Sequence, residues 1–342
     1  MVPCLQRRAI FQACEWSISA DGKRLAFTAK SEHIRSRLFL FDASSGRLSG
    51  SGQAITAPGR TALVPVLSRD GKQVAFCVEL EAGRWELWQK PLIDGREAPI
   101  ISDDYDRRYP QWSSDGAKIT YTRSKINEHE QQIMVWSRES NSEEPLTTRT
   151  SANFPLVYDW SLDGKWLLVS QSGGVREEVW MMPLASAPQA DVAARKILSD
   201  PRYDLWQPRL SPNGRWIVFE AVANTPTSAE SSIYVVFTEG GTWTPITEGK
   251  HWEDKPRWSP DGKTIYFLSG VGGFFNIWGI HFDPSNGKPM GEPFRVSAFE
   301  RPALMIPRSI AVVALSLIQD KLVLTTEEVS GGIWILDGMD RD

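Results

Sequence analysis

The chain has 342 residues, 23% of them charged, and its formal net charge is −4 at pH 7. This near-balance provides no electrostatic footprint for nucleic acid. No apolar run approaches the roughly 18 residues of a membrane-spanning helix, and residues 1–16 include Arg7, Arg8 and Glu15 without the long apolar core of a secretion signal.

A four-residue turn recurs along the chain. In Ser259-Pro260-Asp261-Gly262, proline sets the first central dihedral of a type I turn, aspartate tolerates the second, and glycine takes the left-handed position that closes a bulged hairpin. Copies start at Ser19, Ser68, Ser113, Ser161 and Ser211, and an eroded copy starts at Ser316. Their third positions are 21, 70, 115, 163, 213, 261 and 318. Spacings of this size between strand-rich units are typical of propeller blades.

Each repeat carries four strand signals. The first precedes the turn and the second follows it, as in Ile265-Tyr266-Phe267, whose continuous apolar run indicates a sheet packed on both faces. The third is often aromatic and the fourth is short. A proline lies five residues before the third turn position in four repeats: Pro65, Pro110, Pro208 and Pro256. Since proline cannot donate to a ladder, these first strands are predicted to be edge strands facing a central channel.

The repeats predict an all-β fold, a single domain over residues 1–342 that forms a seven-bladed β-propeller of four-stranded antiparallel blades. The last repeat runs out after its third strand, so we expect an N-terminal strand at residues 3–8 to close the last blade. The expected blades are 11–57, 58–102, 103–148, 149–199, 200–248, 249–298, and 299–338 plus 3–8. In this layout Cys4, Cys14 and Cys77 are too far apart to pair, and all three are predicted to be free thiols.

Catalytic signals are weak. The chain lacks a Gly-x-Ser-x-Gly nucleophile motif, and Gly270-Val271-Gly272-Gly273 lacks the third glycine of a dinucleotide loop. No two of its four histidines are at metal-ligand spacing. Asp103, Asp104 and Asp106 form an acidic loop, which is either a solvated turn or a cation site. We therefore expect no enzymatic activity, no metal and no cofactor.

One mouth of the channel is the candidate binding surface, because the segments leading into the inner strands and the second-to-third-strand loops converge there. The candidate residues are Arg60, Arg107, Arg108, Trp206, Trp252, Asp254 and Arg308, with Tyr109, Asp204, Glu253 and Lys255 beside them. Arginine with exposed tryptophan is typical of binding hot spots. The alternative is that both tryptophans pack between blades and the charges coat the rim.

The repeat carried by residues 256–267, Pro-x-Trp-Ser-Pro-Asp-Gly-Lys-x-Ile-x-Phe, resembles the WD-like repeat of TolB-type propellers. The same unit occurs in tricorn and prolyl-oligopeptidase-like proteases. The resemblance covers essentially the whole chain and implies a propeller that binds proteins, peptides or sugars, or gates a catalytic domain. Some seven-bladed relatives are sugar-acid lyases whose manganese is held by several histidines; only His251 approaches an inner strand here.

The last third is similar to a narrower group. Asn276-Ile277-Trp278-Gly279, Phe282-Asp283-Pro284 and Gly331-Gly332-Ile333-Trp334 resemble the C-terminal propellers of bacterial signalling proteins, where they follow a protein kinase or a winged-helix domain. This chain contains neither domain.

The leading functional prediction is a non-enzymatic binding module that recognises a protein, a peptide or a small polar ligand at the channel mouth. The alternatives are a sensor or regulatory propeller of a kinase-type signalling protein, and a lyase- or peptidase-associated propeller. A monomer is expected, cytoplasmic if this is the whole reading frame and extracytoplasmic if it is part of a TolB-like or signalling protein.

Overall fold

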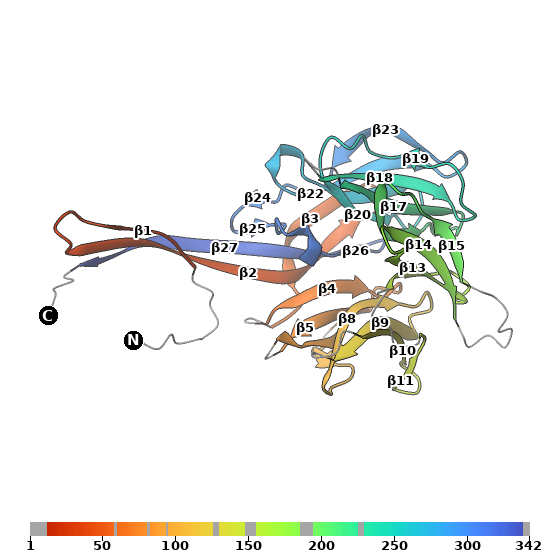
Figure 1. Cartoon of the computed structure of the whole chain (residues 1–342), viewed down its shortest axis with the longest axis horizontal. Helices are drawn as coiled ribbons and strands as arrows, with labels where there is room; N and C mark the ends of the chain where they lie inside the picture. The colour runs from red at the N-terminus through yellow and green to blue at the C-terminus, as the bar shows by residue number, and fades with distance from the viewer. Residues whose placement is uncertain are drawn as a thin grey trace.

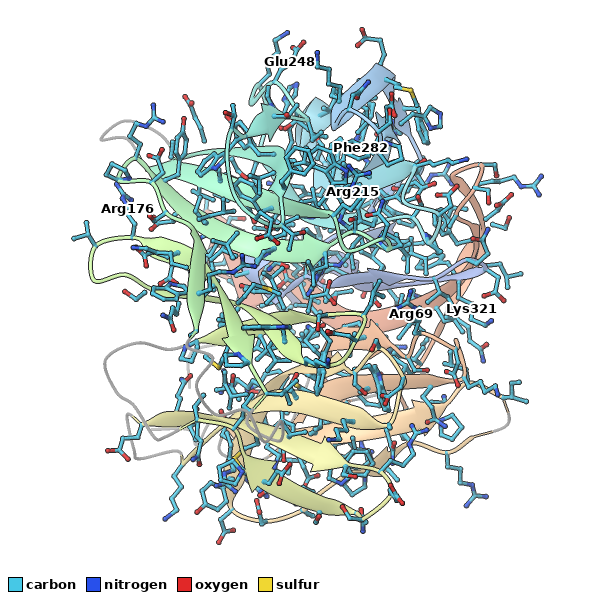
Figure 2. All side chains as sticks on the ribbon, turned by 90° about the vertical axis from the view of Figure 1, so that its right-hand side faces the viewer. Arg69, Arg176, Arg215, Glu248, Phe282 and Lys321 are labelled. Carbon is cyan, nitrogen blue, oxygen red and sulfur yellow. The ribbon has the colours of Figure 1, made fainter. Side chains whose placement is uncertain are left out.

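The computed structural model describes residues 12–57, 60–80, 83–93, 95–125, 130–147, 155–184, 194–224 and 229–337. Across these ranges the chain is all-β, apart from the short 3-10 turns η2 (Val271–Gly273) and η3 (Ile310–Val312). No helix in them is long and apolar enough to cross a membrane. The sheets succeed one another around the molecule, as the ribbon colours show (Figure 2).

The described residues form five four-stranded antiparallel blades, each ordered along the chain around one predicted turn. The first two blades are β4 (Ala62–Leu67), β5 (Gln73–Glu79), β6 (Trp85–Pro91), β7 (Ala98–Pro99) and β8 (Tyr105–Trp112), β9 (Lys118–Lys125), β10 (Gln131–Ser137), β11 (Ser142–Pro145). The third and fourth are β12 (Leu156–Trp160), β13 (Trp166–Ser172), β14 (Glu177–Pro183), β15 (Arg195–Leu198) and β16 (Tyr203–Leu210), β17 (Trp216–Asn224), β18 (Ala229–Phe237), β19 (Thr244–Pro245). The fifth is β20 (Glu253–Trp258), β21 (Thr264–Ser269), β22 (Asn276–Asp283), β23 (Lys288–Arg295).

The two end repeats do not form blades of their own, so the prediction of seven blades is wrong. β2 (Arg24–Asp42) and β27 (Lys321–Asp337) each run through two of the predicted strand signals and pair with each other along 17 residues. They belong to one seven-stranded sheet. Its other strands are β1 (Gln12–Ile18), β3 (Arg47–Ala54), β24 (Glu300–Arg301), β25 (Leu304–Met305) and β26 (Leu315–Leu317). The predicted closing strand at residues 3–8 lies outside the described residues.

The missing turns explain this difference. In three of the five blades, the loop between the second and third strands contains a glycine with a left-handed backbone: Gly83, Gly174 and Gly272, with φ of 74°, 94° and 79°. The corresponding segments of the other two blades contain Asn127, and Asn224 with Pro226. Residues 28–37, at the corresponding place in β2, contain no glycine, proline, asparagine or aspartate. Because the strongest turn-forming residues are absent there, β2 continues straight and pairs with β27, which itself continues through Gly331 and Gly332.

One half of the seven-stranded sheet completes the ring of blades. β26, the first part of β27, the last part of β2, and β3 lie between the fifth blade and the first. Arg257 Nε donates to the Leu315 carbonyl at 2.6 Å, and the Leu67 amide donates to Ser316 Oγ at 3.0 Å. These bonds fasten β26 to a neighbour on each side.

The other half projects from the ring as an arm (Figure 1). We define the arm as β1, residues 24–32 of β2 and residues 328–337 of β27. Within the ring, the far end of β2 meets the eroded turn, where the Phe41 amide donates to the Asp320 carbonyl at 3.1 Å. The arm therefore leaves the ring on the side opposite the Ser-x-Asp-Gly turns.

The core lies between neighbouring sheets. One cluster joins Trp216 and Val218 of β17 to Trp258, Ile265 and Phe282 of the fifth blade. Three inner-strand tryptophans also donate their indole N–H groups to the preceding blade: Trp112 to the Val66 carbonyl (3.2 Å), Trp160 to Thr120 Oγ1 (3.2 Å) and Trp258 to the Arg209 carbonyl (3.1 Å). Each therefore packs and hydrogen-bonds across a blade boundary.

Cys77, on the second strand of the first blade, is a free and completely buried thiol. Burial raises the pKa of this thiol to about 12, so the reactive thiolate is suppressed in the folded chain. Cys4 and the side chain of Cys14 lie outside the described residues.

Candidate functional site

The inner strands of four blades share an irregularity at their prolines. In β4, β8, β16 and β20 the pairing register shifts there. The residue before each proline has a positive φ: Val64 53°, Tyr109 59°, Gln207 54° and Lys255 55°. A left-handed backbone costs a non-glycine residue about 1–2 kcal/mol. Such bulges re-aim the neighbouring side chains, and here they turn them toward the channel.

The residues just after these prolines form a ring inside the channel. Two cavities of 160 Å³ and 350 Å³ share as lining Val66, Gln111, Arg209 and Arg257, together with Asp159 from β12. We call Gln111, Asp159, Arg209 and Arg257 the channel ring. The smaller cavity, the upper chamber, is also lined by the four residues that precede the prolines. The larger one, the turn-side chamber, is also lined by turn residues such as Ser259 and Pro260.

Asp159 is the carboxylate of the channel ring, and backbone groups of two blades hold it. The Trp160 amide donates to Oδ1 at 2.9 Å, and the Leu210 amide donates to Oδ2 at 2.9 Å. Burial raises the pKa of Asp159, although Arg209 and both amides oppose the rise. Both of its oxygens are therefore occupied by N–H groups that stabilise the charged form.

The two arginines of the channel ring are held differently. Arg257 donates to the carbonyls of Leu315 and Pro256, at 2.6 and 2.7 Å. The Arg209 guanidinium carbon lies 5.4 Å above the Tyr158 ring, and Arg209 Nη1 is buried with no hydrogen-bond partner among the described residues. Burial lowers the pKa of both arginines, and Arg209 lowers that of Arg257 further. Two guanidinium groups thus face one carboxylate, which leaves the ring with excess positive charge.

A second buried charge cluster adjoins the upper chamber. Lys255 Nζ donates to both oxygens of Asp254, at 3.1 and 3.0 Å, and both side chains are almost fully buried. The Glu220 carboxyl hydrogen-bonds Asp254 and lies 2.9 Å from Ser231 Oγ. Burial raises the pKa of Glu220 well above its usual range, and the neighbouring Asp254 charge adds to the rise. Burial opposes ionisation of Asp254, but Lys255 and Glu220 together keep its pKa below the usual value.

This cluster should make stability depend on pH. Above the ordinary glutamate pKa of 4.5, the unfolded chain releases the Glu220 proton before the folded chain does, so rising pH favours unfolding. Glu220→Gln keeps the neutral form in both states. We therefore expect the melting temperature of Glu220→Gln, relative to that of the wild-type protein, to increase as pH rises from acidic to mildly alkaline. A difference in melting temperature that stays constant across this pH range would contradict the assignment.

Several of the predicted site residues lie away from the channel. Arg60 stacks at 4.6 Å on Trp88, on the third strand of its blade, and pairs with Glu97 at 3.0 Å. Arg107 is completely buried and pairs with Asp103 (2.5 Å) and Glu143 (3.2 Å) of its own blade.

Arg108 has a half-exposed side chain that pairs with Asp106 at 2.7 Å and lies over Trp85. The acidic loop thus supplies counter-ions for arginine, through Asp103 and Asp106. In the part of the chain that the structure describes, no three His, Cys, Asp or Glu side chains could together hold a metal ion.

Trp206, Trp252 and Arg308 line neither chamber of the channel. Trp206 and Trp252 are half-buried, and Trp252 Nε1 is a buried donor for which the described residues offer no acceptor. Arg308 is exposed on the connection leading to β26. Of the residues predicted at the mouth, Tyr109 and Lys255 line the upper chamber, and Asp254 adjoins it through its pair with Lys255.

The sequence did contain a signal for the channel ring. Gln111, Arg209 and Arg257 each occupy the position after an inner-strand proline. Asp159, like them, lies four residues before the third turn position. The prolines indicate the inner strands, but side chains flanking a bulge cannot be assigned to the channel without the register, because a shift of one residue moves every side chain to the other face.

No family model matches the chain. The uncharacterised peptidase YuxL of Bacillus subtilis is 22% identical over 218 residues, which cover 62% of this chain and 30% of that protein. The chain thus spans about a third of the length of the curated relatives it matches.

Two solved structures illustrate the likeness in fold. A putative TolB from Agrobacterium tumefaciens superposes with a TM-score of 0.54 at 18% identity, covering 77% of this chain and 90% of that one. An oligogalacturonate lyase in complex with manganese has a TM-score of 0.52 at 12% identity, with 86% and 97% covered. Likeness at these identities shows a TolB-like propeller fold and nothing of activity. The narrower resemblance to signalling-protein propellers stays a prediction.

Proposed function

We propose that this protein is a binding module whose central channel receives a carboxylate group of a peptide or small polar ligand. The observation that carries the proposal is the channel ring, where the guanidinium groups of Arg209 and Arg257 outnumber the carboxylate of Asp159. A buried donor without an acceptor is costly, and Arg209 Nη1 is such a donor. An anion that reached it from either chamber would satisfy both its charge and its hydrogen bond.

The state of the other groups supports binding rather than catalysis. The oxygens of Asp159 accept backbone N–H groups, and the Lys255 ammonium is paired with Asp254. These two groups, which could otherwise serve as a base or a nucleophile beside the ring, are therefore already engaged. The upper chamber, at 160 Å³, suits the end of a peptide or one acidic side chain better than a folded surface.

A matched pair of small probes tests the proposal: acetyl-glycyl-glycine with a free carboxylate, and its C-terminal amide. Calorimetric titration should show that the free acid binds and that the amide binds much more weakly. Arg209→Ala and Arg257→Ala should each weaken binding of the acid by roughly tenfold to a hundredfold, because charged hydrogen bonds contribute about 1.5–3 kcal/mol. Arg209→Lys should retain part of the affinity because it keeps the charge.

Two further variants locate the site. Arg202→Ala removes an arginine that is highly exposed and paired with Asp200, so it should leave the affinity unchanged. Arg108→Ala tests the outer rim. If Arg108→Ala weakens binding while Arg209→Ala does not, the ligand binds at the rim and not at the ring. Equal binding of acid and amide, or no binding of either at millimolar concentration, would reject a carboxylate site.

A further inference from the structure

The arm is a blade without neighbours. Its β1–β2 turn has the hydrogen bonds of the turns in the ring: Ser19 Oγ donates to Asp21 Oδ1 at 2.5 Å, and the Arg24 amide donates to Ser19 Oγ at 3.0 Å. In the fifth blade the corresponding distances, at Ser259, are 2.6 and 2.9 Å. β1 and β2 thus form the first hairpin of a repeat, and β27 lies where its third strand would be (Figure 1).

One face of the arm is apolar across all three strands. The register places Trp16, Phe27 and Trp334 in one row across the strands, and Ile18, Leu25 and Leu336 in the next row on the same side. We call these six residues the arm face. Trp16 is 70% exposed, Trp334 58%, and Ile18 and Leu336 51% each.

The ring shows what normally covers such a face. Phe27 lies six residues after the third turn position, as do Phe76, Phe219 and Phe267 of the blades. Those three are at most 2% exposed because a neighbouring blade packs on them. Phe27 is only half-buried. The arm face therefore has the sequence of a blade interior without the blade that should lie against it.

The exposed area is that of an interface. Aromatic side chains bury about 150–250 Å² each, so at these exposed fractions the six residues of the arm face present on the order of 500 Å². Ile333 (76% exposed) and Ile335 (62%) lie on the opposite side of the arm and do not add to this area. A standard interface buries about 800 Å² per partner, and contiguous apolar patches of more than a few hundred Å² are typical of protein–protein contacts, whereas scattered apolar residues on a monomer need no such explanation.

We propose that the arm face packs against the arm face of a second copy of this chain. The surface that fits a blade interior is another blade interior, and the ring has none to offer, since β26 is bonded to both of its neighbours. The arm faces of two copies can pack against each other across a two-fold axis, because such an interface uses the same patch on both copies. Among the described side chains of the arm, Arg24 pairs with Asp337 at 2.7 Å, Lys30 pairs with Glu32, and Glu328 pairs with Arg37 at the base of the arm. Two arms can therefore stack without like-charge repulsion.

The test is the mass of the full chain in solution. Sedimentation equilibrium at micromolar concentrations should give twice the chain mass of 38.4 kDa. The double variant Trp16→Glu, Trp334→Glu should give the mass of one chain, with an unchanged circular dichroism spectrum. The matched controls are Val175→Glu and Ile93→Glu, which place the same charge at residues 88% and 77% exposed on the blades; both should remain dimers.

A cross-link checks the face directly. In a chain whose three cysteines are replaced by serine, Leu336→Cys should form a disulfide between copies on mild oxidation, and Val175→Cys should not. A wild-type protein that sediments as one chain would overturn the proposal, whether its arm stays exposed or is covered by its own chain. So would a dimer that survives the double variant, because the contact would then lie elsewhere.

Discussion

Asp254→Ala should destabilise the protein by about 3–5 kcal/mol, because it leaves the buried Lys255 ammonium without the carboxylate that binds it. Both hydrogen bonds of Lys255 Nζ go to Asp254. Glu220 cannot replace Asp254 unless it ionises, and burial opposes this. Urea unfolding followed by tryptophan fluorescence gives the free energy of unfolding.

The second charge of the pair supplies the control. Asp254→Ala combined with Lys255→Met removes both charges, and most of the lost stability should return, since a buried pair often contributes little more than apolar packing would. Glu239→Ala breaks an exposed pair with Arg195, at 2.6 Å, and should cost less than about 1 kcal/mol. If Asp254→Ala costs no more than Glu239→Ala, Lys255 is not buried as described.

Trp258→Ala should cost about 3–5 kcal/mol by opening a cavity between the fourth and fifth blades. The indole packs edge-on against Phe282 at 5.0 Å between ring centres and is bonded to the Arg209 carbonyl. Trp258→Phe keeps most of the packing and removes the bond, so its cost should be about 1–2 kcal/mol. The same urea titration distinguishes the two. Equal losses in both variants would assign the stabilisation to the hydrogen bond and contradict the packing argument.

The parts of the fold that depend on local chemistry could be predicted from the sequence. Five Ser-x-Asp-Gly or Ser-x-Asn-Gly turns, from Ser68 to Ser259, lie between the first and second strands of five blades. They could be predicted because the turn and the apolar second strand both depend on residues that are adjacent in sequence. The pairing of the chain ends could not be predicted in this way. The sequence contains strand signals on both sides of residues 28–37, but which strand pairs with which depends on a reversal that residues 28–37 do not encode.

The candidate site shows the same division. Pro110, Pro208 and Pro256 predict which strands line the channel, whereas the predicted binding surface is at the channel mouth, on the segments that converge there. The chemistry of the channel ring could not be predicted, because charged residues such as Arg107 and Arg257 look alike in sequence. Burial and register separate them: Arg107 neutralises Asp103 and Glu143 within one blade, whereas the bulge turns Arg257 toward the channel. Only the three-dimensional register decides between a structural and a binding arginine.

The turns and the residues that flank the inner-strand prolines have different roles in each repeat. The turns and the tryptophans that bond across blade boundaries fix the scaffold. Of the residues that flank the prolines, Lys255 and Arg257 also hold the scaffold, through Asp254 and the Leu315 carbonyl, whereas Gln111, Gln207 and Arg209 line the channel. Substitutions at Gln111, Gln207 and Arg209 should therefore change the polarity of the channel lining with little change in the stability of the fold.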